Sequence, residues 1–317
     1  YNPAMDSYFP DNMTVSERGQ LAWSEDNSKL FFGIKDQEQE PEKSNEPKAN
    51  VDVWHWNDER IQSVQMRRAN SDRNFTYRSV LNMNTMRFVR LTDEKMRIVS
   101  MTANSKWGIG RDNTPYQTDI AWGGSQADFY LVDASSGERK PIIAGLGRPM
   151  GTSPDSKWYL YLKDKKIWAY NIESGQTTNL SENASVSFVN IDDDHPYEKP
   201  AYGLAGWTKD GTAVILNHKF DLWSLPLNGA KPVNITGSVG ETEQIRFRYF
   251  SMDSEEDFID TSKPLLLSAY GQWTKKSGYY SVSIGEMPQE IIFEEKSIGR
   301  PAKADKADKI MYTMQTF

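Results

Sequence analysis

Residues 153–180 read SPDSKWYLYLKDKKIWAYNIESGQTTNL, and this stretch has the layout of a small antiparallel sheet. It opens with a Ser-Pro-Asp turn, after which apolar and polar positions alternate as they do in strands. A second run contains Trp168, a turn follows at Ser174-Gly175, and a third run closes at Leu180. The pattern predicts short strands joined by tight corners, in which Asp155 bonds nearby backbone and Gly175 accepts a positive φ.

The same plan recurs in residues 208–236, TKDGTAVILNHKFDLWSLPLNGAKPVNIT. Three aligned pairs are 55 residues apart and one is 54 apart: Asp155 with Asp210, Trp168 with Trp223 and Leu180 with Ile235, and Gly175 with Gly229. A constant offset at several anchor positions indicates an internal repeat rather than a chance resemblance.

Fainter copies of this plan cover most of the chain. They lie at residues 23–35, at 51–58 (VDVWHWND, expected to supply a tryptophan strand), at 77–92 (expected as a two-strand hairpin), at 128–144, at 265–293, and at 308–317 (expected as a strand pair). The last strand of each unit is marked by Leu91, Ile143, Leu180, Ile235 and Ile292. No amphipathic helix longer than about three turns is predicted by the helical spacing of apolar residues.

Short antiparallel strands in units of roughly 40–50 residues predict a β-propeller, in which stacked blades bury each other's faces. We expect an all-β chain of four-stranded blades, about five with fragments, forming a single propeller domain over residues 1–317 that is truncated at both ends. Tryptophans such as Trp168 are expected to fill the wedges between blades. A β-sandwich with coincidental spacing is the weaker alternative.

Composition narrows the class of protein. The chain has 317 residues, a net charge of −7, 12% aromatic residues and no cysteine. The acidic balance gives no basic footprint for nucleic acid, and the lack of cysteine excludes disulfides, thiol nucleophiles and thiolate metal sites within these residues. No apolar run approaches the length of a membrane span, and the first residues carry no signal-peptide pattern. Five Asn-x-Ser/Thr sequons, at Asn12, Asn74, Asn179, Asn183 and Asn234, are interpreted as chance.

The stretch 153–180 resembles blades of the propeller domain in the prolyl oligopeptidase family of serine peptidases, which includes dipeptidyl peptidase IV-like and acylaminoacyl-peptidase-like enzymes. VDVWHWND followed by IQSVQ, then FDLWSLPL and YGQWTKKSGYYSV, is similar to a branch of that family associated with Bacteroidetes-type bacteria. The resemblance implies a periplasmic or secreted parent in which the propeller filters peptides for an α/β-hydrolase domain. That domain would lie beyond residue 317.

Catalytic residues of a serine hydrolase are not evident in the sequence. A nucleophile elbow needs Gly-x-Ser-x-Gly before a helix. The nearest matches, around Ser125 and Ser238, each lack one glycine and are interpreted as loop serines. Of the three histidines, His55 and His218 are interpreted as structural or rim residues of strands, whereas His195 could act as a base or ligand. We therefore expect no catalytic residue in this chain, and GIGRDN at 108–113 lacks the context of a nucleotide site.

Two acidic segments are candidates for binding. Asp192, Asp193 and Asp194 precede His195, but adjacent residues point in different directions and no turn glycine follows, so a solvated loop is preferred over a calcium site. Glu255 and Glu256 could hold a substrate's ammonium group, as a glutamate pair does in dipeptidyl peptidase IV-like enzymes, but they lie in a charged turn that we expect to be a surface loop between blades. No metal or cofactor is assigned, and substrate-binding residues stay unassigned.

Two functions are consistent with these observations. The first is a non-catalytic propeller that gates or orients peptides for the hydrolase domain of a serine peptidase. The second is a stand-alone propeller, similar to TolB or WD40 proteins, that serves as a protein-binding scaffold. A glycosidase propeller is a third possibility, although no carboxylate pair stands out.

Overall fold

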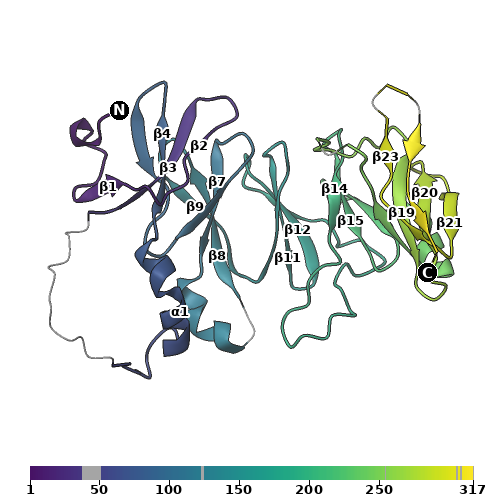
Figure 1. Ribbon diagram of the computed structural model, residues 1–317, viewed down its shortest axis with the longest axis horizontal. Coiled ribbons are helices and arrows are strands. Elements are labelled where there is room, and N and C mark those ends of the chain that lie inside the picture. Colours follow the sequence, from purple (N-terminus) through teal and green to yellow (C-terminus); the bar gives the residue numbers. More distant parts are fainter. Residues whose placement is uncertain (38–50, 123–124, 254, 305, 308, 317) are drawn as a thin grey trace. The chain divides into compact units, whose positions relative to one another are not determined.

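Antiparallel strands are the main regular secondary structure of the described residues (Figure 1). The structure is a computed structural model that describes residues 1–37, 51–122, 125–253, 255–304, 306–307 and 309–316. It divides into two compact units, Tyr1–Gly147 and Arg148–Phe317. The helices of the described part are α1 (Gln62–Arg73), α2 (Val239–Glu243) and two 3-10 helices at Pro3–Met5 and Thr114–Trp122.

The first unit contains two antiparallel sheets. In the first sheet, the long β3 pairs on one edge with both β1 and β2 and on the other with β4, which pairs with β5. The second sheet has the simple order β6-β7-β8-β9. The strands are β1 (Met13–Val15), β2 (Ala22–Trp23), β3 (Lys29–Asp36), β4 (Tyr77–Asn82), β5 (Arg87–Arg90), β6 (Ile98–Met101), β7 (Trp107–Asp112), β8 (Ala127–Asp133) and β9 (Arg139–Leu146).

The second unit contains three four-stranded sheets in strict sequence order, β10-β11-β12-β13, β14-β15-β16-β17 and β18-β19-β20-β21, followed by two strand pairs. The strands of the first two sheets are β10 (Arg148–Thr152), β11 (Trp158–Lys163), β12 (Lys166–Asn171), β13 (Thr177–Asn179), β14 (Leu204–Trp207), β15 (Ala213–Asn217), β16 (Leu222–Pro226) and β17 (Val233–Asn234). Those of the remaining sheets are β18 (Ile245–Tyr249), β19 (Leu265–Gly271), β20 (Ser277–Val282), β21 (Gln289–Glu294), β22 (Ser297–Ile298), β23 (Ala302–Lys303), β24 (Ile310–Met311) and β25 (Met314–Gln315).

One hydrogen-bond pattern builds the corner between the first two strands of a sheet. In the Ser-Pro-Asp corner, the hydroxyl of Ser153 donates to Asp155 Oδ1 at 2.6 Å and accepts the backbone N–H of Trp158 at 2.9 Å. The same bonds recur at Ser24-Asp26-Lys29, Thr102-Asn104-Trp107 and Thr208-Asp210-Ala213. Because the four hydroxyl residues are buried, each satisfies backbone groups that would otherwise be left unpaired. The predicted role of Asp155 as a corner residue is confirmed.

The turn between the third and fourth strands requires a left-handed residue. Its φ is +72° at Gly175, +78° at Gly137 and Gly229, and +88° at Gly285. In the first sheet the corresponding residue is Met86, at +53°. Glycine adopts this conformation without a steric penalty, which explains why Gly punctuates the repeat in the sequence.

In each of three sheets, a second buried hydroxyl group forms a hydrogen bond just after the last strand. Thr92, Ser181 and Thr236 each accept the backbone N–H of a residue 14 positions earlier, at 2.7, 2.9 and 3.2 Å. The donors, Arg78, Ile167 and Leu222, lie at the start of the third strand. The residue before each hydroxyl is one of the predicted last-strand markers, Leu91, Leu180 or Ile235, and all three are buried.

Two of the sequons belong to this closure. The side-chain oxygens of Asn179 and Asn234 accept the backbone N–H of Ser181 and Thr236 at 3.1 and 3.0 Å. Asn-x-Ser and Asn-x-Thr at these two positions are therefore structural parts of the blade.

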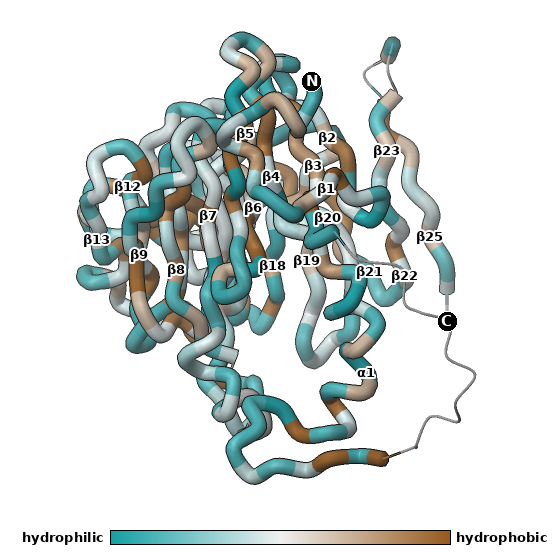
Figure 2. Tube along the Cα trace, turned by 90° about the vertical axis from the view of Figure 1, so that its left-hand side faces the viewer, coloured by the Kyte–Doolittle hydropathy of each residue, from teal (hydrophilic) through white to brown (hydrophobic). Residues whose placement is uncertain are grey.

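Neighbouring sheets within each unit share apolar cores. In the second unit one cluster lies between β10–β13 and β14–β17, and another lies between β14–β17 and β18–β21. In the first unit one cluster joins the two sheets. Figure 2 shows apolar residues along the strands and polar residues at their turns. Burial of each large aliphatic side chain stabilises the fold by about 1.5–3 kcal/mol.

The two aligned tryptophans occupy equivalent positions in their sheets. Trp168 pairs with Asn179 and Trp223 pairs with Asn234, so the two tryptophans are structurally equivalent. Trp223 is buried in the cluster between β10–β13 and β14–β17 and packs edge-on against Phe188. Trp168 lies on the face of its sheet away from that cluster, where it is half-buried and donates its indole N–H to Lys163 O. A tryptophan that fills the space between two sheets is thus observed at Trp223, and the same role for Trp168 stays a prediction.

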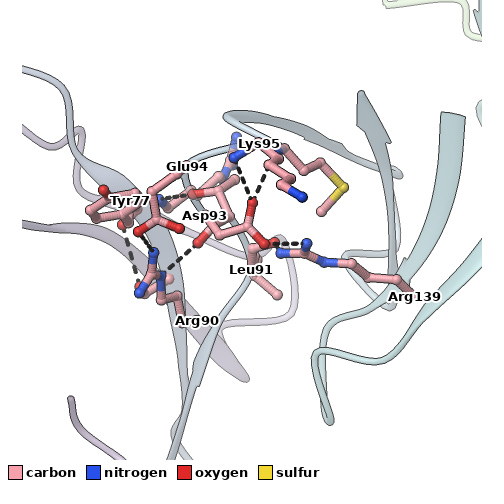
Figure 3. A network of polar contacts seen from close by, with 11 residues as sticks. Tyr77, Arg90, Leu91, Asp93, Glu94, Lys95 and Arg139 are labelled. Atoms are coloured by element: carbon pink, nitrogen blue, oxygen red, sulfur yellow. Dashed lines mark hydrogen bonds and ion pairs between the residues drawn. The ribbon is translucent and has the colours of Figure 1, made fainter. Parts of the chain in front are cut away.

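Ion pairs fasten the connection between the two sheets of the first unit (Figure 3). Arg139 of β9 binds Asp93 at 2.5 Å and also donates to the carbonyl of Leu91. Arg90 pairs with Glu94 at 3.0 Å and lies over the ring of Tyr77. Burial raises the pKa of Asp93, but the amide of Met96 and the Arg139 guanidinium outweigh it, so the pKa is below its ordinary value.

Two predicted elements are wrong. Residues 51–58 are exposed and form no strand, and they lead into α1, which buries none of its residues. A helix without an apolar face leaves no periodic signal, because the apolar spacing template detects only amphipathic helices. In the 308–317 segment, β24 and β25 do not pair with each other: β24 pairs with β23, and β25 pairs with β22. The hairpins at 77–92, 128–144 and 265–293 are confirmed.

Candidate binding pocket

The turn chemistry of the first four sheets is replaced in β18–β21 by a long loop, residues 250–264, between the first two strands. This loop and the adjoining strand ends surround an open pocket of about 910 Å³. The volume lies in the range of pockets that hold small ligands or peptide segments. Its lining comprises four carboxylates (Asp253, Glu256, Asp257, Asp260), three lysines (Lys209, Lys263, Lys303) and an apolar and hydroxyl remainder (Tyr249, Phe250, Ser251, Met252, Phe258, Pro264, Leu265, Leu266, Ala304).

One wall of the pocket carries a tyrosine–carboxylate pair. The hydroxyl of Tyr249, at the end of β18, donates to Glu256 Oε2 at 2.6 Å. Burial, and then the bond to Glu256, raise the pKa of Tyr249 well above its ordinary value. Tyr249 therefore stays a neutral donor, and Glu256 keeps its second oxygen for another partner.

A second group of polar contacts in the lining centres on Asp260. This carboxylate accepts the hydroxyl of Ser262 at 2.6 Å and pairs with Lys263 at 3.1 Å and Lys209 at 3.7 Å. The Ser262 hydrogen bond, followed by that of Lys263, holds the pKa of Asp260 far below its usual range. Its charge is thus largely matched by cations of the pocket itself.

The remaining groups of the lining are charged side chains and an engaged hydroxyl. The formal charge of the lining is −4 from the carboxylates and +3 from the lysines, a net −1. Ser251 donates its hydroxyl to the carbonyl of Asp253, so its proton is engaged. The lining includes neither histidine nor cysteine, and a serine needs an adjacent base to act as a nucleophile.

Glu255 and Glu256, the two glutamates singled out in the sequence, differ in their relation to this pocket. Both are exposed, as expected for a surface loop, but Glu256 lines the pocket and Glu255 does not. Their loop lies within one sheet, between β18 and β19, rather than between blades as expected.

The serines of the incomplete elbows have other roles. Ser125 Oγ accepts a hydrogen bond from Arg111 at 2.7 Å. Ser238 precedes the short helix α2, which the sequence did not indicate, and its Oγ accepts the side-chain N–H of Asn234. Both hydroxyls are thus bound by donors, whereas an activated serine donates to a base.

The three histidines lie in three different settings. His55 is exposed and accepts the backbone N–H of Asn57. His195 is bound by Asp193 at 2.9 Å and stacks on Tyr197. His218 packs edge-on against Tyr202, and burial lowers its pKa.

The three carboxylates before His195 make separate contacts and do not form one binding site. Asp192 pairs with Lys219 at 3.0 Å, Asp193 binds His195, and the side chain of Asp194 is fully exposed. Among the described residues no group of three or more His, Asp or Glu side chains could hold a metal ion. Residues 108–113 belong to strand β7 and its end, not to a phosphate-binding loop.

Sequence reasoning missed the pocket because it is made by an insertion. The signal was present as an insertion of 15 residues, 250–264, between two strand patterns. The Ser251-x-Asp253 sequence within it does not form the corner of the other sheets, because the Ser251 hydroxyl donates to the backbone carbonyl of Asp253. An interruption of a repeat marks a loop on one edge of the stacked sheets, where binding sites of repeat proteins are often found.

No protein-family model matches the chain, and no curated protein sequence matches it. Three solved structures illustrate its similarities. The propeller domain of the trilobed protease from Pyrococcus furiosus is 11% identical, with 93% of this chain and 79% of that chain covered and a TM-score of 0.39. Dipeptidyl peptidase 4 of Porphyromonas gingivalis is 10% identical over 90% of this chain but only 41% of its own, with a TM-score of 0.41. TolB from Acinetobacter baumannii is 12% identical, over 91% and 63%, with a TM-score of 0.32.

These similarities are weak, and the fold is assigned from the chain's own topology. Repeated four-stranded antiparallel sheets in sequence order, each packed on the next within its unit, define an all-β protein of the propeller class. The predicted fold class is confirmed. Among the described residues, no helix is long and apolar enough to cross a membrane.

Proposed function

We propose that the chain is a non-catalytic propeller module of a serine peptidase resembling the prolyl oligopeptidases, and that it binds peptides and orients them for a hydrolase domain. The resemblance of residues 153–180 and of FDLWSLPL to blades of that family supports the class of parent. The pocket between β18 and β19 is the observation that carries the binding role. The same resemblance supports a periplasmic or secreted parent.

The chemistry of the pocket matches a peptide. Phe250, Phe258 and Leu265 offer apolar surface, and the second oxygen of Glu256 offers an acceptor for an N–H or ammonium donor. The lysines of the lining can bind carbonyl or carboxylate groups. Extended peptides present both kinds of group at regular spacing.

The experiment is calorimetric titration of the 317-residue chain with short unstructured peptides. We expect binding that weakens at least about fivefold in Glu256→Gln and Tyr249→Phe. Glu255→Gln is the matched control, because Glu255 lies in the same loop outside the pocket, and it should bind as the unaltered chain does. Equal affinity of all variants would remove the pocket from the proposal.

The non-catalytic part of the proposal has its own test. The purified chain should give no turnover of aminoacyl- or prolyl-chromogenic substrates. A gene that continues beyond codon 317 into a Gly-x-Ser-x-Gly elbow followed by Asp and His would support the peptidase parent. Turnover by the chain itself, or a stop codon directly after codon 317, would contradict it.

One observation favours a second candidate function, that of a protein-binding scaffold. Trp54 and Trp56 are 68% and 91% exposed, and Val51 and Val53 beside them are also exposed. Large exposed tryptophans are unusual on a monomer's surface and are enriched in protein interfaces. If this segment mediates protein binding, Trp54→Ser with Trp56→Ser should abolish association with a purified partner while leaving peptide titrations unchanged.

A further inference from the structure

Large apolar side chains are exposed along residues 51–73, the segment that leads into α1 and includes it, which we call the α1 arm. Helix α1 itself buries none of its residues, and Figure 2 shows apolar residues where the arm begins. Seven of the 27 exposed large apolar residues of the described part lie within the first 16 residues of the arm: Val51, Val53, Trp54, Trp56, Ile61, Val64 and Met66. Exposed apolar surface gathered in this way marks a site of interaction.

Hydrogen bonds fold the residues before α1 back along the helix. Gln65 Nε2 donates to Arg60 O at 2.6 Å and to Asp58 Oδ2 at 3.2 Å. One turn earlier, Gln62 Nε2 donates to Asp52 Oδ1 at 3.4 Å. The two tryptophans that lie between these two anchored acids therefore belong to one structured surface with α1.

The composition of the α1 arm is that of a protein interface. It contains two of the 10 tryptophans and four of the 15 arginines of the chain, but none of its 22 lysines. Trp, Met and Arg are enriched in protein interfaces and Lys is depleted there. A lipid surface fits less well, because Val64 and Met66 lie on opposite sides of α1 whereas a helix bound to a membrane has one apolar face.

The charges of the α1 arm favour a second copy of the same chain as the partner. Its four carboxylates and four arginines cancel, whereas the whole chain carries −7. Two copies repel each other through their net charge, and the repulsion is least where a surface is locally neutral. Both signs are exposed in the arm, at Asp52 and Glu59 and at Arg67 and Arg73, so each can meet its opposite on another copy.

Arg68 has hydrogen-bond donors available for such a partner. Three guanidinium groups share the carboxylate of Asp72: Arg97 at 2.8 Å, Arg60 at 3.6 Å and Arg68 at 3.9 Å. Arg97 makes the shortest pair and also lies over the ring of Phe75. One carboxylate does not neutralise three cations, and the side chain of Arg68 is 49% exposed. Arg68 can therefore form a strong pair with a carboxylate of another molecule.

We propose that the chain forms a homodimer in which the α1 arms of two copies pack against each other about a two-fold axis. A two-fold interface uses the same patch on both copies, and a patch with apolar residues and equal numbers of both charges is complementary to itself. Trp54 and Trp56 bury their rings against the other arm, and Arg68 pairs with its carboxylates. The 23 residues of the arm are close to the roughly 20–30 that each partner contributes to a standard interface. This dimer gives the protein-binding candidate function a definite partner and is independent of peptide binding between β18 and β19.

Sedimentation equilibrium of the 317-residue chain over micromolar concentrations tests the dimer. We expect a monomer–dimer equilibrium without larger species, because a two-fold interface closes at two copies. Trp54→Ser with Trp56→Ser should weaken dimerisation at least about tenfold, since tryptophans dominate interface energies. Trp273→Ser is the matched control: Trp273 is 77% exposed but lies outside the arm, so this variant should dimerise as the unaltered chain does.

Charge reversal tests whether the α1 arm is complementary to itself. Arg67→Glu with Arg68→Glu changes the charge of the arm from zero to −4, and Asp52→Lys with Glu59→Lys changes it to +4. Each variant alone should be monomeric where the unaltered chain is dimeric, because like charges repel across the interface. An equimolar mixture of the two variants should dimerise again. Hydrogen exchange of α1, fast in the monomer, should slow as the unaltered chain is concentrated.

Each contrary result overturns the dimer. A chain that stays monomeric at every concentration would leave the arm to a different protein, while peptide binding through Glu256 would stand. Dimerisation that survives the two substitutions in the arm would place the interface elsewhere, and equal weakening by Trp273→Ser would indicate unspecific association. If the tryptophan variant loses its native circular dichroism spectrum, the charge-reversed mixture decides: its failure to associate would exclude the pairing of the arms.

Discussion

Thr236 shows how much of this fold depends on single buried hydroxyl groups. Its Oγ1 donates to Asp221 Oδ1 at 2.6 Å and accepts the backbone N–H of Leu222 at 3.2 Å, and it has no exposed surface. Removing the hydroxyl leaves a buried carboxylate short of a donor and a buried amide short of an acceptor. Each such loss costs about 1–3 kcal/mol.

Thr236→Val keeps the shape of the side chain but not the hydroxyl, and we expect it to lower the free energy of unfolding by about 2–4 kcal/mol, measured by urea denaturation. Thr236→Ser retains both hydrogen bonds and should lose only about 1 kcal/mol for the methyl group. A valine variant as stable as the unaltered chain would show that these bonds contribute nothing net.

The carboxylates of the corners should make stability depend on pH. Hydrogen bonds from Ser24 and Ser28 lower the pKa of Asp26 from 3.8 to about 2. Because the folded-state pKa lies below the unfolded one, the stabilisation is fully present above about pH 4 and is lost as the pH falls toward 2. Carbon-detected NMR should find the Asp26 carboxyl titrating near pH 2, and Asp26→Asn should flatten the decline of stability in that window. Titration near pH 3.8 would contradict the hydrogen bonds described.

At the scale of elements, two opposite substitutions in the turn before the fourth strand can test the effect of its left-handed backbone on stability. Met86 occupies the left-handed position that Gly175 occupies in β12–β13, and it is largely exposed. A non-glycine residue in this conformation costs roughly 1–2 kcal/mol. We therefore expect Met86→Gly to raise the free energy of unfolding by about 0.5–1 kcal/mol and Gly175→Ala to lower it by about 1 kcal/mol, both in thermal or urea melts. The same sign for both would show that backbone strain does not govern this turn.

The repeat made the corners and turns predictable from sequence. The segments that interrupt the repeat were not predicted. Asp155, Gly175 and Leu180 act through bonds within their own sheet, so their spacing predicted the corner, the turn and the buried closing position. Helix α1 was missed because it has no buried face to set a period. The pocket was missed because its loop, residues 250–264, brings Tyr249 and Glu256 together through a conformation that no repeat specifies.

At the scale of the whole molecule, burial predicts a gradient of protection. Strands β11, β12, β15 and β16 carry the residues of the shared cores. Helix α1 buries none of its side chains, and β23, β24 and β25 are exposed throughout. Hydrogen exchange should therefore be slowest in the former strands and fastest in the latter elements. Uniform protection in both groups would mean that α1 or the last strands are covered by something else in solution.

The spacing of 14 residues between each closing hydroxyl and its amide has a consequence for how the chain is made. In the four-stranded sheets, pairing links neighbouring strands in sequence order, so the backbone pairing of each of these sheets is completed within a short length of chain. Local contacts favour fast folding, and chains that fold as they are synthesised complete their N-terminal parts first. Each blade can thus close, with its hydroxyl in place, while the next is still being translated, and the growing protein never needs to expose more than one unfinished sheet.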